Sequence, residues 1–133
     1  MSADKIHFVV IDDSKLDCFI AEKVIQNTGR CESVRSFMMA ADALEFLGKQ
    51  PFDDEHRIMI LVDIQMPIMN GFEFIESFEA IVPEERRRNY IINLLSSSIN
   101  ESDMIRAKAY QSVRTFLNKP LTKSSIEDFL VKI

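Results

Sequence analysis

The sequence has 133 residues, of which 47% are hydrophobic, so it predicts one domain with enough apolar material for a buried core. The formal net charge of −5 at pH 7 argues against a surface that binds nucleic acid or anionic membranes directly. No apolar run approaches the roughly 18 residues needed to cross a bilayer, and the polar start does not resemble a signal peptide. Cys18 and Cys31 match no metal or redox spacing, and we expect reduced thiols in a cytoplasmic protein.

The first half of the chain alternates between strand-like and helix-like patterns. "KIHFVVI" is a short β-rich run, and the apolar residues after it recur at helical spacing, as Leu16, Phe19 and Val24 do, until Gly29. The elements expected here are, in chain order, a strand at 5–11, a helix from Leu16 towards Gly29, a strand at 33–38 and a helix at 40–48.

The second half continues the same alternation. "IMILVD" is the most hydrophobic strand candidate, and Pro83 ends the helical pattern that follows it. "PEERRRN" is charged throughout and predicts a solvated connection. The expected elements are strands at 58–63, 90–95 and 112–117, and helices at 71–83, at 101–110 and over the last residues. The apolar stripe of the last helix consists of Ile126, Phe129, Leu130 and Ile133.

Strands that alternate with helices predict an α/β fold, with a doubly wound parallel sheet covered by helices on both faces. We find no internal repeat, linker or low-complexity segment. The expected organisation is therefore one domain over residues 1–133, without an output domain.

Residues with functional side chains follow several of the predicted strands. Asp12 and Asp13 end the first strand, Asp63 ends the third, Ser96 ends the fourth, and Lys119 comes just after the fifth. Open parallel sheets bind ligands beyond the carboxyl ends of their strands. We therefore expect three carboxylates, one hydroxyl and one ammonium to converge at one edge of the sheet.

These groups suit metal-assisted phosphate chemistry. Three neighbouring carboxylates repel one another unless a cation lies among them, and an all-oxygen set favours Mg²⁺. Such an ion attracts phosphate oxygens, and one carboxylate can attack phosphorus. Lys119 and the Ser96 hydroxyl could then contact the transferred phosphoryl group.

Four motifs in this order, "VVIDDS", "LVDIQMPIMNG", "LLSSS" and "FLNKP", resemble the receiver domain of two-component response regulators over essentially the whole chain. The resemblance implies the flavodoxin-like strand order 2-1-3-4-5 and a phosphoryl group accepted on Asp63 from a histidine kinase or histidine phosphotransfer protein. It also implies partner binding by the phosphorylated state, with a monomer or a phosphorylation-dependent dimer, and no enzymatic activity beyond self-phosphorylation and slow autodephosphorylation.

The resemblance assigns a role to each matching position. For Mg²⁺, it implies Asp13 and Asp63 as direct ligands, the backbone carbonyl of Gln65 as a further ligand, and Asp12 through water. For the switch, it implies Ser96 as the hydroxyl, Lys119 as the cation, Phe116 as the aromatic residue and a cis bond before Pro120.

Some of these assignments have alternatives. The family usually has threonine where Ser96 stands and often tyrosine where Phe116 stands, so the coupling to output is less well defined. The switch serine can shift by one position to Ser97, and Phe116 can be an ordinary core residue. Asp12, Asp13 and Ser14 can also act as caps of the first helix.

Four other functions fit parts of the pattern. A haloacid dehalogenase phosphatase needs a second aspartate two residues after its nucleophile, where Gln65 stands. A flavodoxin-like carrier must hold a phosphate in its first loop, where Asp12 and Asp13 would repel it. A phosphorelay shuttle, or an interaction module that ignores phosphorylation, keeps the fold and stays open.

Overall fold

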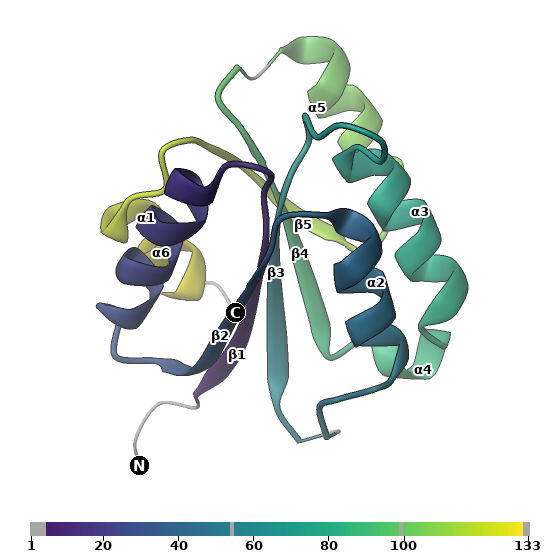
Figure 1. Ribbon diagram of the computed structural model, residues 1–133, viewed down its shortest axis with the longest axis horizontal. Helices are drawn as coiled ribbons and strands as arrows, with labels where there is room; N and C mark the ends of the chain where they lie inside the picture. The colour runs from purple at the N-terminus through teal and green to yellow at the C-terminus, as the bar shows by residue number, and fades with distance from the viewer. Residues whose placement is uncertain (1–4, 54, 99, 132–133) are drawn as a thin grey trace.

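The structure is a computed structural model that describes residues 5–53, 55–98 and 100–131. Its strands form one parallel sheet in the order β2-β1-β3-β4-β5, which confirms the predicted fold (Figure 1). The strands are β1 Ile6–Ile11, β2 Cys31–Phe37, β3 Arg57–Asp63, β4 Tyr90–Ser96 and β5 Val113–Asn118. The helices are α1 Lys15–Gln26, α2 Ala40–Gly48, α3 Gly71–Ile81, α4 Glu84–Arg87, α5 Glu101–Ala107 and α6 Lys123–Val131.

Helices cover both faces of the sheet, as a parallel sheet requires. Figure 1 shows α1 and α6 on one side and α2, α3, α4 and α5 on the other. Successive residues of β3 point to opposite faces, so Ile60 joins the core beneath α2 and α3 while Leu61 joins the core beneath α1 and α6. Both side chains are fully buried, and the central strand is therefore apolar on both faces.

Two of the apolar residues that predict α1 lie outside the face that the helix buries. Leu16 and Phe19 are 66% and 56% exposed, and the buried residues of α1 are Cys18, Ala21 and Ile25. Cys18 and Ala21 are small, so this face lets the helix lie close to the sheet. The helix itself is confirmed, but its orientation differs from the one its largest apolar residues suggest.

The charged segment after α3, predicted as a solvated connection, contains a short helix. Residues 84–87 form the one-turn helix α4, and none of them is buried. The backbone carbonyl of Pro83 accepts hydrogen bonds from the amides of Arg86 and Arg87. Ile133, which belongs to the predicted stripe of the last helix, lies outside the described residues.

A buried amide connects the three strands β3, β4 and β5. Asn93 of β4 is fully buried, and its Nδ2 donates to the carbonyl of Ile60 over 3.4 Å. Its Oδ1 accepts a hydrogen bond of 2.6 Å from the hydroxyl of Thr115, its register partner on β5. A buried polar side chain is tolerated here because both ends of its amide have partners.

Among the described helices, none combines the length and the apolar character that a membrane span needs.

Candidate functional site

Three aspartates meet beyond the carboxyl ends of β1 and β3. Asp12 and Asp13 follow β1, and Asp63 is the last residue of β3. Carboxylate oxygens of all three lie within 4.8 Å of one another. Asp12 and Asp63 are only 1% and 5% exposed, whereas Asp13 is exposed to solvent. The structure thus brings together acidic residues that are about fifty positions apart in the sequence, as the strand pattern predicts.

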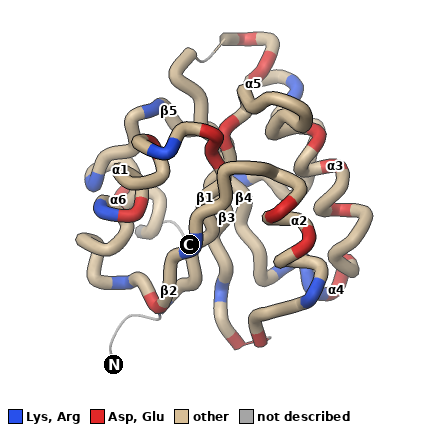
Figure 2. The backbone as a smooth tube through the Cα atoms, in the orientation of Figure 1, with Lys and Arg blue, Asp and Glu red and all other residues tan. Residues whose placement is uncertain are grey.

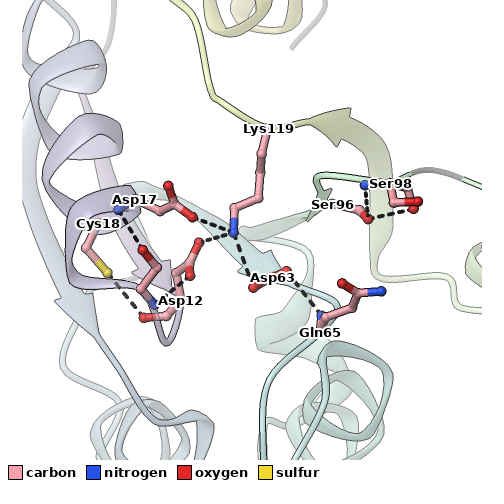
Figure 3. Close-up of polar contacts among 9 residues, drawn as sticks. Asp12, Asp17, Cys18, Asp63, Gln65, Ser96, Ser98 and Lys119 are labelled. Carbon is pink, nitrogen blue, oxygen red and sulfur yellow. Dashed lines mark hydrogen bonds and ion pairs between the residues drawn. The ribbon is translucent and has the colours of Figure 1, made fainter.

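Lys119 supplies the positive charge in this corner (Figure 3). Its Nζ lies 2.8 Å from Oδ2 of Asp12, 2.8 Å from Oδ2 of Asp17 and 3.3 Å from Oδ2 of Asp63. Burial alone would lower the pKa of Lys119, but the carboxylates of Asp12, Asp17 and Asp63 outweigh it and raise this pKa above its ordinary value. The ammonium is therefore charged throughout the physiological pH range.

The environment of Asp63 raises the pKa of its carboxyl group. Burial raises its pKa, and the negative charge of Asp12 raises it further. The amide N–H of Gln65, 3.1 Å from Oδ1, and the ammonium of Lys119 act in the opposite direction. Burial and the charge of Asp12 thus disfavour the ionised form of Asp63. A carboxyl group in such an environment is a good candidate for a group that reacts or binds a cation.

Asp17 is a residue of the site that the sequence reasoning missed. It lies in the first turn of α1, where its amide donates to the N-cap hydroxyl of Ser14 over 3.2 Å. The cap fixes the start of the helix, and the Asp17 side chain then points to Lys119 (Figure 3). The available signal was an acidic residue three positions after a capping serine, beside a strand that ends in aspartates.

Ser96 ends β4 with its hydroxyl bonded within its own loop. The hydroxyl donates to the carbonyl of Ser98 over 2.9 Å and accepts from the amide of Ser98 over 3.0 Å. Ser96 is 1% exposed whereas Ser97 is exposed, so Ser96 is the serine at the buried strand end. Its backbone carbonyl accepts from the amide of Lys119 over 2.9 Å, which places the lysine next to β4.

Phe116 belongs to β5, three residues before Lys119. It is partly buried and packs against the core on the α2 and α3 side of the sheet. This position is compatible with a core role and with a switch role, so the sequence assignment of Phe116 stays a prediction. The bond between Lys119 and Pro120 is cis, as the resemblance implies.

Gly71 allows the chain to pass very close to Asp63. A Cβ atom at Gly71 would lie 2.8 Å from the backbone oxygen of Asp63 and 2.9 Å from the Cα of Ile64. The amide of Gly71 donates to the carbonyl of Ile64 over 2.9 Å, and Asn70 and Glu73 form a capping box at the same helix end. The start of α3 is therefore pinned against the end of β3.

Cys18 packs beside the site without taking part in its chemistry. Its Sγ donates to the backbone carbonyl of Asp12 over 3.3 Å (Figure 3). Burial raises the pKa of Cys18 to about 11, and the negative charge of Asp12 adds to this effect. The thiol is thus protonated near neutral pH and unreactive.

The donor set of this corner fits Mg²⁺. Hard carboxylate oxygens are the ligands that Mg²⁺ prefers, with waters and a backbone carbonyl to complete the octahedron. Asp13 and Asp63 would hold the ion directly, Asp12 would act through water, and Gln65 would offer its backbone carbonyl two residues after Asp63. Bound there, Mg²⁺ would neutralise charge on phosphate oxygens.

Replacing Asp13 with alanine is expected to weaken Mg²⁺ binding about tenfold or more, because a direct ligand is lost. Isothermal titration calorimetry measures the affinity. Asp128→Ala, which removes an exposed carboxylate of α6, is the matched control and should bind Mg²⁺ like the wild type. An unchanged affinity of Asp13→Ala would remove this residue from the ligand set.

The sequence matches the family described as the response regulator receiver domain over residues 8–130. A response regulator receiver protein of Dyadobacter fermentans is 32% identical, with 96% of each chain covered and a TM-score of 0.83. A two-component response regulator of Cytophaga hutchinsonii is 27% identical, with 98% of this chain and 97% of that chain covered and a TM-score of 0.85.

Longer proteins also contain a similar segment. A two-component response regulator of Oryza sativa is 27% identical over 122 residues, which are 90% of this chain and 51% of that protein. A hybrid signal transduction histidine kinase of Dictyostelium discoideum is 27% identical over 128 residues, which are 93% of this chain and 7% of the kinase. The chain thus spans about half the length of the rice relative and a small part of the kinase.

Proposed function

The chain belongs to the family of response regulator receiver domains, and we therefore propose that it is a signalling protein switched by phosphorylation of Asp63. The observation that supports this best is the buried Asp63 carboxylate, held beside Asp12 and within 3.3 Å of the Lys119 ammonium. This arrangement provides an acceptor, acidic groups for a cation and a fixed positive charge in one corner.

The proposed reaction is phosphoryl transfer to Asp63. One of its carboxylate oxygens attacks phosphorus on a phosphohistidine of the donor protein, the P–N bond breaks, and an acyl phosphate forms on the aspartate. Lys119 then contacts the phosphoryl oxygens as a point charge. We expect slow hydrolysis to return the free carboxylate, so that the protein acts as a switch and has no separate substrate to turn over.

Magnesium-dependent phosphorylation by acetyl phosphate tests this function. Intact-protein mass spectrometry should show the addition of one phosphoryl group when Mg²⁺ is present and almost none when it is chelated. The same assay separates the alternatives, since neither a flavodoxin-like carrier nor an interaction module that ignores phosphorylation would be labelled. A phosphatase would turn over a phosphate ester, which we do not expect here because Gln65 stands where its acid would be.

For the switch, we propose that Ser96 exchanges its partner. Its hydroxyl, bonded to Ser98 in the structure described here, would turn to the phosphoryl group on Asp63. Phe116 would then turn inward and reshape the face made by α5, β5 and α6. A pull-down that compares the beryllofluoride-activated protein with the untreated one identifies the partner that reads this face.

We propose that the phosphodonor approaches Asp63 past the start of α1. Leu16 and Phe19 are exposed on this helix and offer an apolar surface near the site. A histidine kinase or a histidine phosphotransfer protein is the donor that the family suggests. Whether the phosphoryl group then moves on to another protein depends on its lifetime on Asp63. We propose that this exchange takes place in the cytoplasm.

Replacing Asp17 with asparagine is expected to lengthen the life of the phosphorylated state about two- to fivefold. Asp17 holds the Lys119 ammonium at 2.8 Å and competes with the phosphoryl group for it. A partly exposed ion pair of this kind is worth about 0.2–1 kcal/mol, which sets the size of the effect. Loss of the phosphoryl signal with time, measured by mass spectrometry, tests it. An equal lifetime in the variant would show that Asp17 does not compete.

A further inference from the structure

A hollow of about 950 Å³ lies at the amino ends of β3, β4 and β5, away from the aspartates. This volume is within the range of pockets that hold small molecules. Its charged lining consists of Arg57, Arg87, Arg88, Arg114, Glu79 and Glu84. In Figure 2, basic segments are visible beside α4, where part of this lining lies. Four arginines gather here on a chain with a formal charge of −5.

The two glutamates of the hollow are already engaged. Glu84 pairs with Arg87 at 3.9 Å, and the carboxylate of Glu79 accepts a hydrogen bond from the hydroxyl of Ser112. The backbone carbonyl of Glu79 also accepts from Nη1 of Arg87 over 3.2 Å. These contacts with Glu84 and Glu79 fix the guanidinium group of Arg87.

The other three arginines of the lining differ from Arg87 in their ion pairs. Within residues 5–53, 55–98 and 100–131, neither Arg57 nor Arg88 nor Arg114 forms an ion pair with a carboxylate. They come from the start of β3, from the segment after α4 and from β5, so the fold and not one local run assembles them. Like charges brought together in this way repel, and an anion that binds among them would relieve the repulsion.

We propose that this hollow binds a di- or triphosphate group, either free or as part of a nucleotide. Guanidinium groups match phosphate oxygens with paired N–H donors, and several of them can share the charges of a phosphate chain. Gln111 in the same lining adds an uncharged hydrogen-bond donor. Both glutamates already have partners in the protein. The charge that a ligand meets in the hollow is therefore mainly that of Arg57, Arg88 and Arg114.

This site is independent of the proposed phosphorylation. Tyr90, which lines the hollow, begins β4, and Ser96 ends it, so the two sites lie at opposite ends of one strand. A ligand in the hollow would not touch Asp63 or its acidic neighbours. The Asp63→Asn variant should therefore bind a phosphate chain as the wild type does, even though it cannot be phosphorylated.

Isothermal titration calorimetry in magnesium-free buffer of about 0.1 M ionic strength, where the Debye length is about 10 Å, tests the proposal with inorganic tripolyphosphate, inorganic phosphate, ADP and ATP as probes. The wild type should bind tripolyphosphate more tightly than phosphate. Arg57→Ala combined with Arg114→Ala should weaken this binding about tenfold or more, and the corresponding double lysine variant should lose less. Tighter binding of ATP than of tripolyphosphate would identify a nucleotide, and equal binding would identify the phosphate chain alone.

A double variant with the same change in charge, Lys23→Ala with Lys49→Ala, is the control, because both lysines are exposed on other elements. It should bind tripolyphosphate within about twofold of the wild type, since a distant surface charge is screened by salt. The proposal is overturned if the wild type does not bind tripolyphosphate, if both double variants lose affinity equally, or if the arginine variants unfold at the wild-type temperature and bind like the wild type.

Discussion

The Asp63→Asn variant is expected to take up no phosphoryl group from acetyl phosphate under conditions in which the wild type is labelled. Asparagine keeps the size of the side chain and can still accept from the amide of Gln65, but its amide cannot attack phosphorus to form an acyl phosphate. It also removes one of the charges beside Asp12 and Lys119. Intact-protein mass spectrometry with Mg²⁺ present measures the labelled fraction.

Asp128→Asn, a change of the same kind on the exposed face of α6, should be labelled like the wild type. Labelling of Asp63→Asn at the wild-type level would move the acceptor to another residue. Loss of labelling through unfolding is excluded by the thermal unfolding temperature. At pH 7 this temperature should be equal to that of the wild type or higher, because the variant lacks a buried charge.

The pH dependence of stability gives a second readout of the same carboxyl group. Burial raises the pKa of Asp63 above its ordinary value of 3.8, so the folded state holds the proton more tightly than the unfolded chain. Its contribution to stability is present below pH 3.8 and is lost as the pH rises through the raised pKa. In metal-free protein, the wild type should therefore lose stability relative to Asp63→Asn as the pH rises over this interval, measured by urea unfolding.

Replacing Gly71 with alanine is expected to lower the free energy of unfolding by about 1–3 kcal/mol, the cost of overpacking a close contact. The added methyl would lie 2.8 Å from the backbone oxygen of Asp63, so either the start of α3 or the end of β3 has to move. Because Asp63 ends β3, we also expect slower phosphorylation by acetyl phosphate. Urea unfolding and the labelling rate measure the two effects.

Gly48→Ala is the matched control for this change. Gly48 is the last residue of α2, and a Cβ atom there would meet only Cδ1 of Ile81 at 3.7 Å, an ordinary contact. Alanine also favours the helix by about 0.5–1 kcal/mol over glycine, so this variant should be as stable as the wild type or more so. If Gly71→Ala behaved in the same way, the close approach to Asp63 would not constrain the site.

Much of this molecule could be predicted because its main signals are local. The apolar run before Asp63 identifies a strand buried on both faces, and the alternation of strands and helices then fixes where the strand ends meet. Asp12, Asp63 and Lys119 were placed together on that ground, and the structure shows them in contact with one another through the lysine.

The errors came where tertiary packing overrides a local pattern. The stripe of Leu16 and Phe19 predicts a helix, but small residues such as Ala21 allow closer packing on the sheet and take the buried face. Asp17 lies in the first turn of α1, where acidic residues are common, and its partner Lys119 is too far away in sequence to be indicated by a local pattern. No periodicity in "PEERRRN" indicates that Arg87 and Arg88 share a hollow with residues of β3, β4 and β5.

The amide of Asn93 also constrains how a signal can cross this fold. Because it hydrogen-bonds the backbone of β3 and the hydroxyl of Thr115 at once, sliding β4 past both neighbours would break two hydrogen bonds inside an apolar core, and sliding β3 or β5 past β4 would break one. The central strands of the sheet are therefore expected to keep their positions relative to one another. We therefore expect any conformational change that starts at Asp63 to be carried by side-chain rotamers and by the loops at the strand ends.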